Sequence, residues 1–341
     1  MILRALALGR AIKARAVELG FDRVGIGPAT PRRGTELARW LDAGYAGTMA
    51  YLDRTRAERA DPARLLPGVR SAVAVAANYN PGARDDGDWA PVARYARGRD
   101  YHDVLRPRLQ ALADFIDDAA GPGTRSRAAV DTSAVLERDL AARAGLGWVG
   151  KNTNVLAEDL GSYFFIGLVL TTAPLELDGE QPDRCGTCTA CLDACPTGAF
   201  VAPYVLDARR CLSYLTIEHR GPIAPELRPA VREWIFGCDV CQEVCPWNRK
   251  APVARDPDLA PDRPLGPLAA LLDIGDAEFR ERFRRTALWR ARRAGLARNV
   301  ALALGARGDV GEEKALGRAA RDPDAVVADA AAWAVARLRR E

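Results

Sequence analysis

CGTCTACLDACP, residues 185–196, is the first of two cysteine runs in this chain, and CDVCQEVCP, residues 238–246, is the second. The first run has the spacing C-x2-C-x2-C-x3-C-P, which is typical of bacterial ferredoxins that hold two [4Fe–4S] clusters. In such a run, three cysteines bind one cluster and the fourth binds the other. The spacing therefore predicts a protein that moves single electrons through two clusters.

The second run is one ligand short, because Ile235 stands three residues before Cys238, where a further cysteine is expected. Cys211 lies between the two runs and is the one cysteine left to replace it. With Cys211 included, all eight cysteines of the chain are used. The predicted sites are one of Cys185, Cys188, Cys191 and Cys245 and one of Cys195, Cys211, Cys238 and Cys241.

Two other uses of eight cysteines are weaker. Structural zinc sites also take four cysteines, but this spacing followed by proline is not zinc-like. Four disulfides would need an oxidising compartment. The N-terminus, residues 1–20, has only a short apolar patch, broken by Arg10 and Lys13, so no signal peptide is expected. No stretch approaches the ~18–20 apolar residues of a membrane span. We therefore expect a cytoplasmic protein without a membrane partner.

The charge of the chain is mildly basic, with a net charge of +4 and a pI near 8.7. This balance is compatible with a nucleic-acid partner. Of the 49 basic residues only four are Lys, and Ala is abundant, so an Arg-biased genome explains part of the charge. An Arg-rich stretch between residues 280 and 298 is therefore either a phosphate-binding surface or a solvated helix face.

Hydrophobic periodicity places alternating strands and helices in residues 1–175, which indicates an α/β or α+β domain. Residues 251–267 are rich in Pro and Asp, a linker composition. The remainder is helical, with short helices paired as in HEAT-like repeats. The expected helices cover residues 4–19, 104–119 and 136–145, and the expected strands cover residues 21–27, 71–79, 127–131 and 161–172.

Two motif matches fail. GLGWVGK, residues 145–151, has P-loop spacing, but Asn152 replaces the Ser or Thr that binds Mg²⁺, and the segment follows a helix. DYH, residues 100–102, begins like the D-x-H-x-x-G motif that supplies a lower His ligand to cobalamin, but Leu105 occupies the Gly position. Since the chain has only two His, a site built on several imidazoles is excluded.

Asp131 is the one catalytic candidate that the pattern singles out. It stands where a short apolar strand ends, a common place for a catalytic carboxylate. The alternative is that Asp131 caps the helix that begins near Val135.

Several long blocks together resemble the epoxyqueuosine reductase family, closely over residues 1–250. They are YARGRDYHDVLRPRL (95–109), VDTSAVLERDLAARAGLGWVGKNTN (130–154), APYVLDARRCLSYLTIEHRGPIAPELRP (202–229) and GCDVCQEVCPWN (237–248). The resemblance implies reduction of epoxyqueuosine to queuosine at the wobble position of tRNA, with cobalamin and two [4Fe–4S] clusters. It also implies an α+β protein with an α/β cobalamin-binding domain similar to reductive dehalogenases (1–175), a ferredoxin-like module (176–250), and a linker with HEAT-like helices (251–341).

The resemblance also assigns roles to residues. Asp131 becomes the proton donor, and burial beneath the cofactor would raise its pKa and keep it protonated. Arg220 matches a tRNA contact, and Leu168 stands where the family often has an acidic residue. An external electron donor and a monomeric state are implied as well. The implied cobalamin contacts are Arg54, Arg94, Asp131, Val155, Ser213, Cys238, Asp239, Val240 and Cys241.

Two rival functions fit the sequence less well. A reductive dehalogenase-like enzyme acting on a small molecule is usually exported with a twin-arginine signal, but polar sequence follows Arg32 and Arg33 here. A ferredoxin-type electron carrier would not need the ~180 residues that precede the clusters. Bound cobalamin would separate the carrier from either reductase.

Overall fold

The computed structural model describes residues 2–82, 92–262 and 264–340. Its centre is a four-stranded sheet with the order β1-β2-β6-β3, in which every neighbouring pair is antiparallel. Residues 1–175, called the first region below, are therefore α+β rather than α/β, because an α/β fold needs parallel strands. The strands are β1 (Arg23–Pro28), β2 (Ser71–Asn78), β3 (Ser126–Ala129) and β6 (Phe164–Thr171).

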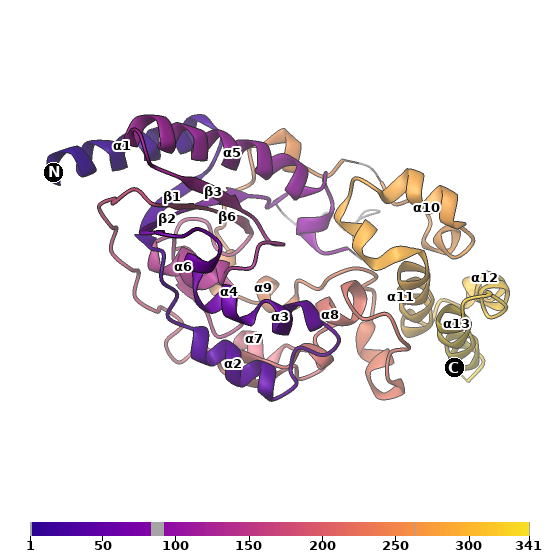
Figure 1. The fold of residues 1–341 in the computed structure, drawn as a ribbon. Coiled ribbons are helices and arrows are strands. Elements are labelled where there is room, and N and C mark those ends of the chain that lie inside the picture. Colours follow the sequence, from indigo (N-terminus) through magenta and orange to yellow (C-terminus); the bar gives the residue numbers. More distant parts are fainter. Residues whose placement is uncertain (1, 83–91, 263, 341) are drawn as a thin grey trace.

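Helices cover both faces of the sheet, and β2 is accordingly buried along its whole length. On one face Val73 and Val75 pack with α1 (Ile2–Glu18) and α5 (Tyr101–Ala120). On the other face the small alanines of β2 pack with α6 (Glu137–Arg143). Figure 1 shows α1 and α5 together above the sheet and α6 below it. The expected helices and strands of this region are confirmed, with ends shifted by a few residues.

The segment that resembled a P-loop forms a small hairpin after α6. Its strands are β4 (Trp148–Val149) and β5 (Val155–Leu156), paired antiparallel. A P-loop would join a strand to the start of a helix. The structure therefore agrees with the rejection of that motif.

The cysteine region is built from short elements. Helices α7 (Ala190–Asp193) and α9 (Val240–Glu243) lie against each other, one from each cysteine run. Between them the chain forms the hairpin β7 (Phe200–Ala202) and β8 (Val205–Leu206), followed by α8 (Leu212–Ile217).

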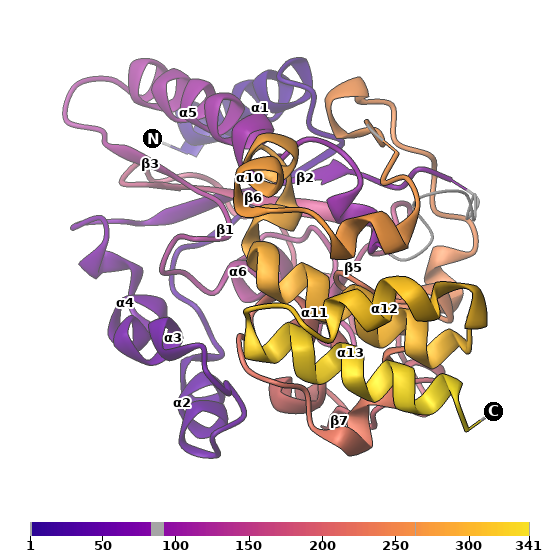
Figure 2. The same cartoon turned by 90° about the vertical axis from the view of Figure 1, so that its right-hand side faces the viewer.

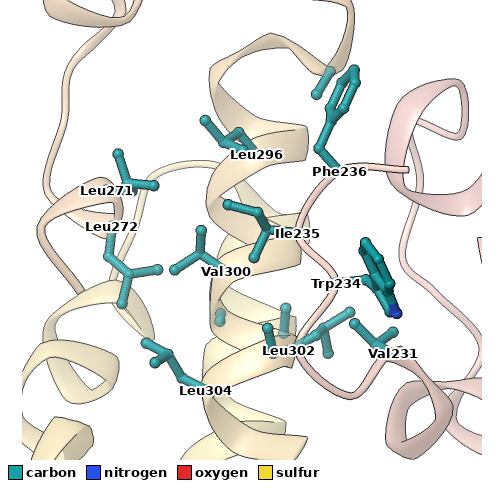
Figure 3. Packing of buried hydrophobic residues seen from close by; sticks show 14 of the residues in the cluster. Val231, Trp234, Ile235, Phe236, Leu271, Leu272, Leu296, Val300, Leu302 and Leu304 are labelled. Carbon is teal, nitrogen blue, oxygen red and sulfur yellow. The ribbon is translucent and has the colours of Figure 1, made fainter. Parts of the chain in front are cut away.

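The C-terminal part is helical, as expected, with α11 (Arg292–Arg307) packed against α13 (Ala325–Leu338) (Figure 2). The core of these helices continues into the segment before the second cysteine run. Trp234, Ile235 and Phe236 share one buried hydrophobic cluster with Val300 of α11, and Ile235 is the one that points toward Val300 (Figure 3). The segment that leads into the second cysteine run is therefore held by the same hydrophobic core as the C-terminal helices. The remaining helices are α2 (Gly34–Asp42), α3 (Ala50–Arg54), α4 (Arg56–Ala60), α10 (Asp276–Phe283) and α12 (Glu313–Ala319).

The stretch expected to be a linker has little regular structure, apart from a short 3-10 helix over Pro257–Leu259. It is nevertheless attached to the first region. The side-chain amide of Asn78 donates to the carbonyl of Pro252, and Arg108 pairs with Asp256. Among the described residues, no helix is both long and apolar enough to span a membrane.

Candidate active site and cluster sites

Asp131 lies just beyond the end of β3 in a backbone conformation that only a minority of residues adopt. Its φ is +45°, in the left-handed region that disfavours most side chains but tolerates Asp better than most. Such strain is often found at functional sites. The side chain is 55% exposed, so Asp131 is only partly buried. The alternative role as a helix cap is wrong, because α6 begins at Glu137 and its N-cap residue is Leu136.

His102 links Asp131 to a second carboxylate. The Nε2 of His102 lies 3.1 Å from Oδ2 of Asp131, and its Nδ1 lies 2.7 Å from Oδ1 of Asp100. Asp100 is the N-cap residue of α5 and also accepts the backbone N–H of His102. The ring stacks on Tyr101, with centroids 4.2 Å apart, and Tyr101 in turn stacks on Phe165 at 4.3 Å. The imidazole is thereby fixed between the two carboxylates.

The contacts of Asp131 with His102 and Tyr101 determine the direction of its pKa shift. Burial by itself would raise the pKa of Asp131, but hydrogen bonds from His102 and Tyr101 outweigh it and lower the pKa below its usual value. Burial would likewise lower the pKa of His102, yet its bonds to Asp100 and Asp131 raise it to about 9. These contacts favour an ionised Asp131 beside a protonated His102.

A third carboxyl group, that of Glu137, also contacts the turn that carries Asp131. Glu137 opens α6, and burial raises its pKa to about 8, with the negative charge of Asp131 as the next cause. Its carboxyl accepts the backbone N–H of Asp131. Its Oε1 is buried and has no hydrogen-bond partner among the described residues. Glu137 therefore supports the strained turn as a neutral acid near pH 7. Sequence reasoning missed it, although it lies within the quoted block at 130–154.

A cavity of about 340 Å³ lies between the first region and the C-terminal helices. Arg290 donates two hydrogen bonds to the Glu218 carboxylate, at 2.9 and 3.1 Å, and its guanidinium lies 5.8 Å from the Tyr51 ring centroid. Arg290 lowers the pKa of Asp131, and Asp131 raises the pKa of Tyr51, so two residues of the cavity wall interact electrostatically with the candidate acid, which is not itself part of the wall. The cavity is lined by Thr48, Tyr51, Glu218, Arg220, Gly221, Arg290 and Arg292.

The predicted tRNA contact Arg220 lies in the wall of this cavity, and its guanidinium donates to the carbonyl of Ala291 at 2.8 Å. The arginines of the stretch between residues 280 and 298 differ in their exposure. Arg292 is exposed and stacks over Trp289, 5.0 Å from the ring centroid. Arg298 is 1% exposed, so its expected place on a phosphate-binding surface is wrong. The exposed members are Arg280, Arg284, Arg285, Arg290 and Arg292.

Arg298 instead ties α11 to the chain that carries Arg220. Its guanidinium donates to the carbonyls of Leu215, His219 and Gly221, at 2.5, 2.9 and 2.7 Å. The neighbouring Asn299 donates to the carbonyls of Thr216 and Ile235. Burial lowers the pKa of Arg298 to about 10, which leaves it charged near neutral pH.

We expect Arg298→Ala to destabilise the protein by about 1–3 kcal/mol or more, because the buried carbonyl of Leu215 and the part-buried carbonyls of His219 and Gly221 lose their donor and an unpaired buried group costs about 1–3 kcal/mol. Anaerobic denaturant unfolding measures the change. Arg307→Ala is the matched control, since Arg307 is exposed at the far end of the same helix. Equal stability of the two variants would show that the network around Arg298 contributes nothing.

The residues predicted to contact cobalamin are brought together only in part. Arg94 meets the loop between two cysteines, because its backbone N–H donates to Oδ2 of the buried Asp239 at 2.7 Å. Its guanidinium donates to Asn80 and lies over Tyr163, while its buried Nε has no partner among the described residues. That unpaired N–H suits a polar cofactor group.

The other predicted cobalamin contacts are more scattered. Arg54 is exposed at the end of α3, Val155 is buried at the start of β5, and Ser213 lies in α8 beside Cys211. Leu168 is fully buried in β6 opposite Ala74 and Ala129. An acidic residue there would face an apolar core, so its absence leaves no gap in the site.

None of the eight cysteines forms a disulfide, and most of their electrostatic effects on one another fall within two groups, although Cys191 of one group also raises the pKa of Cys241 of the other. Burial raises the pKa of Cys191 first, and then the charges of Cys245 and Cys185 raise it further. Burial likewise raises the pKa of Cys238 first, and Cys211 and Cys195 add to it. The neighbours are thus Cys185, Cys188, Cys191 and Cys245 on one side and Cys195, Cys211, Cys238 and Cys241 on the other. Two sites of four thiolates are the donor set that [4Fe–4S] clusters take.

Comparisons with known proteins agree with this arrangement. A family model described as a 4Fe-4S double cluster binding domain matches residues 184–248, and one described as epoxyqueuosine reductase QueG, DUF1730, matches residues 59–132. The epoxyqueuosine reductase of Pseudomonas aeruginosa is 45% identical over 308 residues, covering 87% of this chain and 85% of that protein. That of Gloeobacter violaceus is 46% identical over 318 residues, covering 87% and 96%.

Solved structures match over nearly the whole chain. A crystal structure of epoxyqueuosine reductase with an epoxyqueuosine-modified tRNA-Tyr stem loop has a TM-score of 0.87 at 32% identity, covering 98% of this chain and 91% of that one. An epoxyqueuosine reductase from Bacillus subtilis, whose catalytic aspartate loop is swung out of the active site, has a TM-score of 0.86 at 32% identity, with the same coverage.

Proposed function

Because this chain belongs to the epoxyqueuosine reductase family, we propose that its site reduces the epoxide of epoxyqueuosine in a tRNA anticodon and so forms queuosine. The reaction removes the epoxide oxygen as water and leaves an alkene. It consumes two electrons and two protons. The eight cysteines would hold two [4Fe–4S] clusters, each of which would pass one electron at a time from an external donor. Cobalamin, when bound, supplies a cobalt centre that collects these electrons and reduces the epoxide.

The observation that carries the proposal is the placement of Asp131. Its carboxyl is presented on a strained turn, in contact with His102 and under the electrostatic influence of Arg290 in the cavity wall. The departing epoxide oxygen develops negative charge and needs a proton, which a positioned acid can supply. We assign this donation to Asp131. Arg94, with its contact to Asp239, supports the proposed cobalamin set of Arg54, Arg94, Asp131, Val155, Ser213, Cys238, Asp239, Val240 and Cys241.

We assign a separate role to each of three regions, as the resemblance implies. Residues 1–175 would hold cobalamin and residues 176–250 the clusters, while residues 251–341 would form the linker and HEAT-like helices. Pairing of α11 with α13 supports a HEAT-like unit. The shared core around Trp234 and Val300 keeps the tail in a constant position relative to the clusters. A tRNA held by the tail would then place its anticodon beside Asp131.

The decisive test is reconstitution. The protein is purified anaerobically, loaded with iron, sulfide and cobalamin, and supplied with a chemical reductant and tRNA that carries epoxyqueuosine. Nucleoside analysis should find queuosine in place of epoxyqueuosine. A protein that holds both clusters and cobalamin and converts none of the substrate would refute the proposal.

The exposed arginines around the cavity predict a salt-dependent interface. Each phosphate that they neutralise releases counterions, so tRNA affinity should fall steeply between about 50 and 200 mM salt. We expect Arg292→Gln to reduce the slope of log affinity against log salt by about 0.7–0.9. Arg307→Gln, at the other end of α11, should leave the slope unchanged. Filter binding across a salt series measures both, and a slope unaltered in Arg292→Gln would remove Arg292 from the interface.

A further inference from the structure

His102 is the one imidazole that touches the candidate acid, and its surroundings determine how many protons the group holds. Each ring nitrogen faces a carboxylate oxygen, Nδ1 toward Asp100 at 2.7 Å and Nε2 toward Asp131 at 3.1 Å. A neutral imidazole has one donor and one acceptor, whereas an ionised carboxylate only accepts. Both contacts can be hydrogen bonds only if the group holds one extra proton, either on His102 or on a carboxyl.

The other side of His102 faces solvent. A recess of about 340 Å³ lies along the first turns of α5, and the imidazole forms part of its wall. The side chain of His102 is 21% exposed. Water in the recess can therefore reach the His102 side chain beside its contact with Asp131. The recess is lined by His102, Asp103, Arg106, Pro107 and Gln110.

From this geometry we propose that His102 is a proton relay, which takes protons from the recess on α5 and passes them to Asp131 for each turnover. The inference rests on the proposed role of Asp131 as the proton donor. In the resting group the extra proton lies on His102. As the substrate reacts, His102 transfers its Nε2 proton to Asp131, Asp131 gives that proton to the departing oxygen, and water then returns one proton to Nε2 of His102. Asp100 orients the ring through Nδ1 and stabilises the imidazolium.

The charged and titratable groups around the relay favour this order. Asp131 is also reached by the hydroxyl of Tyr101 and by the positive charge of Arg290, both of which stabilise its ionised form. The relay proton therefore stays on His102 until the surroundings of Asp131 change. Asp103 and Arg106 share the recess with the ring. The further groups that act on Asp131 electrostatically are Tyr51, Arg59, Tyr95, Asp100 and Glu137.

The first test is the pKa of His102 itself, which needs no turnover. The chain has only two His, so ¹⁵N-histidine labelling and His219→Gln assign the His102 signals directly. In the protein with both clusters oxidised, His102 should titrate with a pKa of about 9. Asp131→Asn and Asp100→Asn should each bring it closer to the ordinary 6.5. A His102 pKa near 6.5 that is unchanged in Asp131→Asn would rule out the contact.

The second test is the pH profile of the single-turnover rate. The wild-type rate should stay level up to about pH 9, because the pair keeps its proton until His102 is deprotonated. In His102→Ala the proton must stay on Asp131 alone, so the rate should begin to fall at least about two pH units lower. At neutral pH we expect a loss of about 10²-fold, and imidazole that enters the recess should restore part of it. His219→Gln is the control and should keep the wild-type profile.

These outcomes separate the relay from the function on which it rests. If the wild type converts epoxyqueuosine but His102→Ala keeps the wild-type pH profile and ignores imidazole, the relay is wrong and the function stands. If His102→Ala is equally slow at every pH, the ring is only structural and the relay is again wrong. If the reconstituted wild type converts nothing, the proposed function fails, while the NMR titration still reports on the contact.

Discussion

Asp131→Asn is expected to lower the single-turnover rate of epoxide reduction by about 10²–10⁴-fold, the range for loss of a positioned acid. Asparagine has nearly the same shape as aspartate but cannot give a proton to the departing oxygen. The left-handed turn should survive, because Asn tolerates a positive φ about as well as Asp does. The defect should therefore appear in the chemical step, with cobalamin and tRNA binding retained.

The measurement is a single turnover with pre-reduced, cobalamin-loaded enzyme and excess protein, so electron delivery does not limit the rate. Asp118→Asn is the control, an exposed carboxylate near the far end of α5 that is distant in sequence from the turn. A near-wild-type rate in Asp131→Asn would remove Asp131 from the acid role. A lost rate together with lost cobalamin binding would point to a structural defect, so the absorption spectrum of the loaded variant is recorded alongside.

The sequence predicted Asp131 correctly as a residue at a strand end, but it did not reveal the hydrogen bonds that lower the pKa of its carboxyl. Burial was the only influence that the sequence made visible. The opposing influence comes from His102, 29 residues away, and it depends on the start of α5 meeting the end of β3. The DYH segment fails the cobalamin-ligand motif at Leu105, and nothing in its own sequence indicates a contact with a carboxylate. Only the folded arrangement reveals a pair.

Arg298 shows a second limit of sequence reasoning. In the stretch RARRAGLARNV, residues 290–300, nothing distinguishes an arginine on the surface from one in the core. Its burial depends on carbonyl groups near residues 215–221, which are available because the chain bends there after α8. By contrast, the strands and helices around the sheet were predictable, because each is encoded by periodicity within its own residues.

The assignment of the cysteines to the two cluster sites can be tested by combining substitutions, and the predicted effects on iron content are large. Cys211→Ser should lower the iron content from about eight to about four atoms per chain, since one [4Fe–4S] site loses a ligand. Conversion supported by an external donor should fall to background, because the path of single electrons is broken. Thr187→Ala, in the exposed loop between Cys185 and Cys188, should keep both clusters.

The double variants distinguish crossed pairing from local pairing. If Cys195 completes the site of Cys211, Cys195→Ser with Cys211→Ser should retain about four iron atoms, because both changes damage one cluster. Cys245→Ser with Cys211→Ser should retain almost none, because the two changes then fall on different clusters. Local pairing within each run predicts the reverse of both results. Iron analysis and the electron paramagnetic resonance of the reduced proteins therefore decide which thiolates share a cluster, and the thiol neighbourhoods in the structure favour the crossed set.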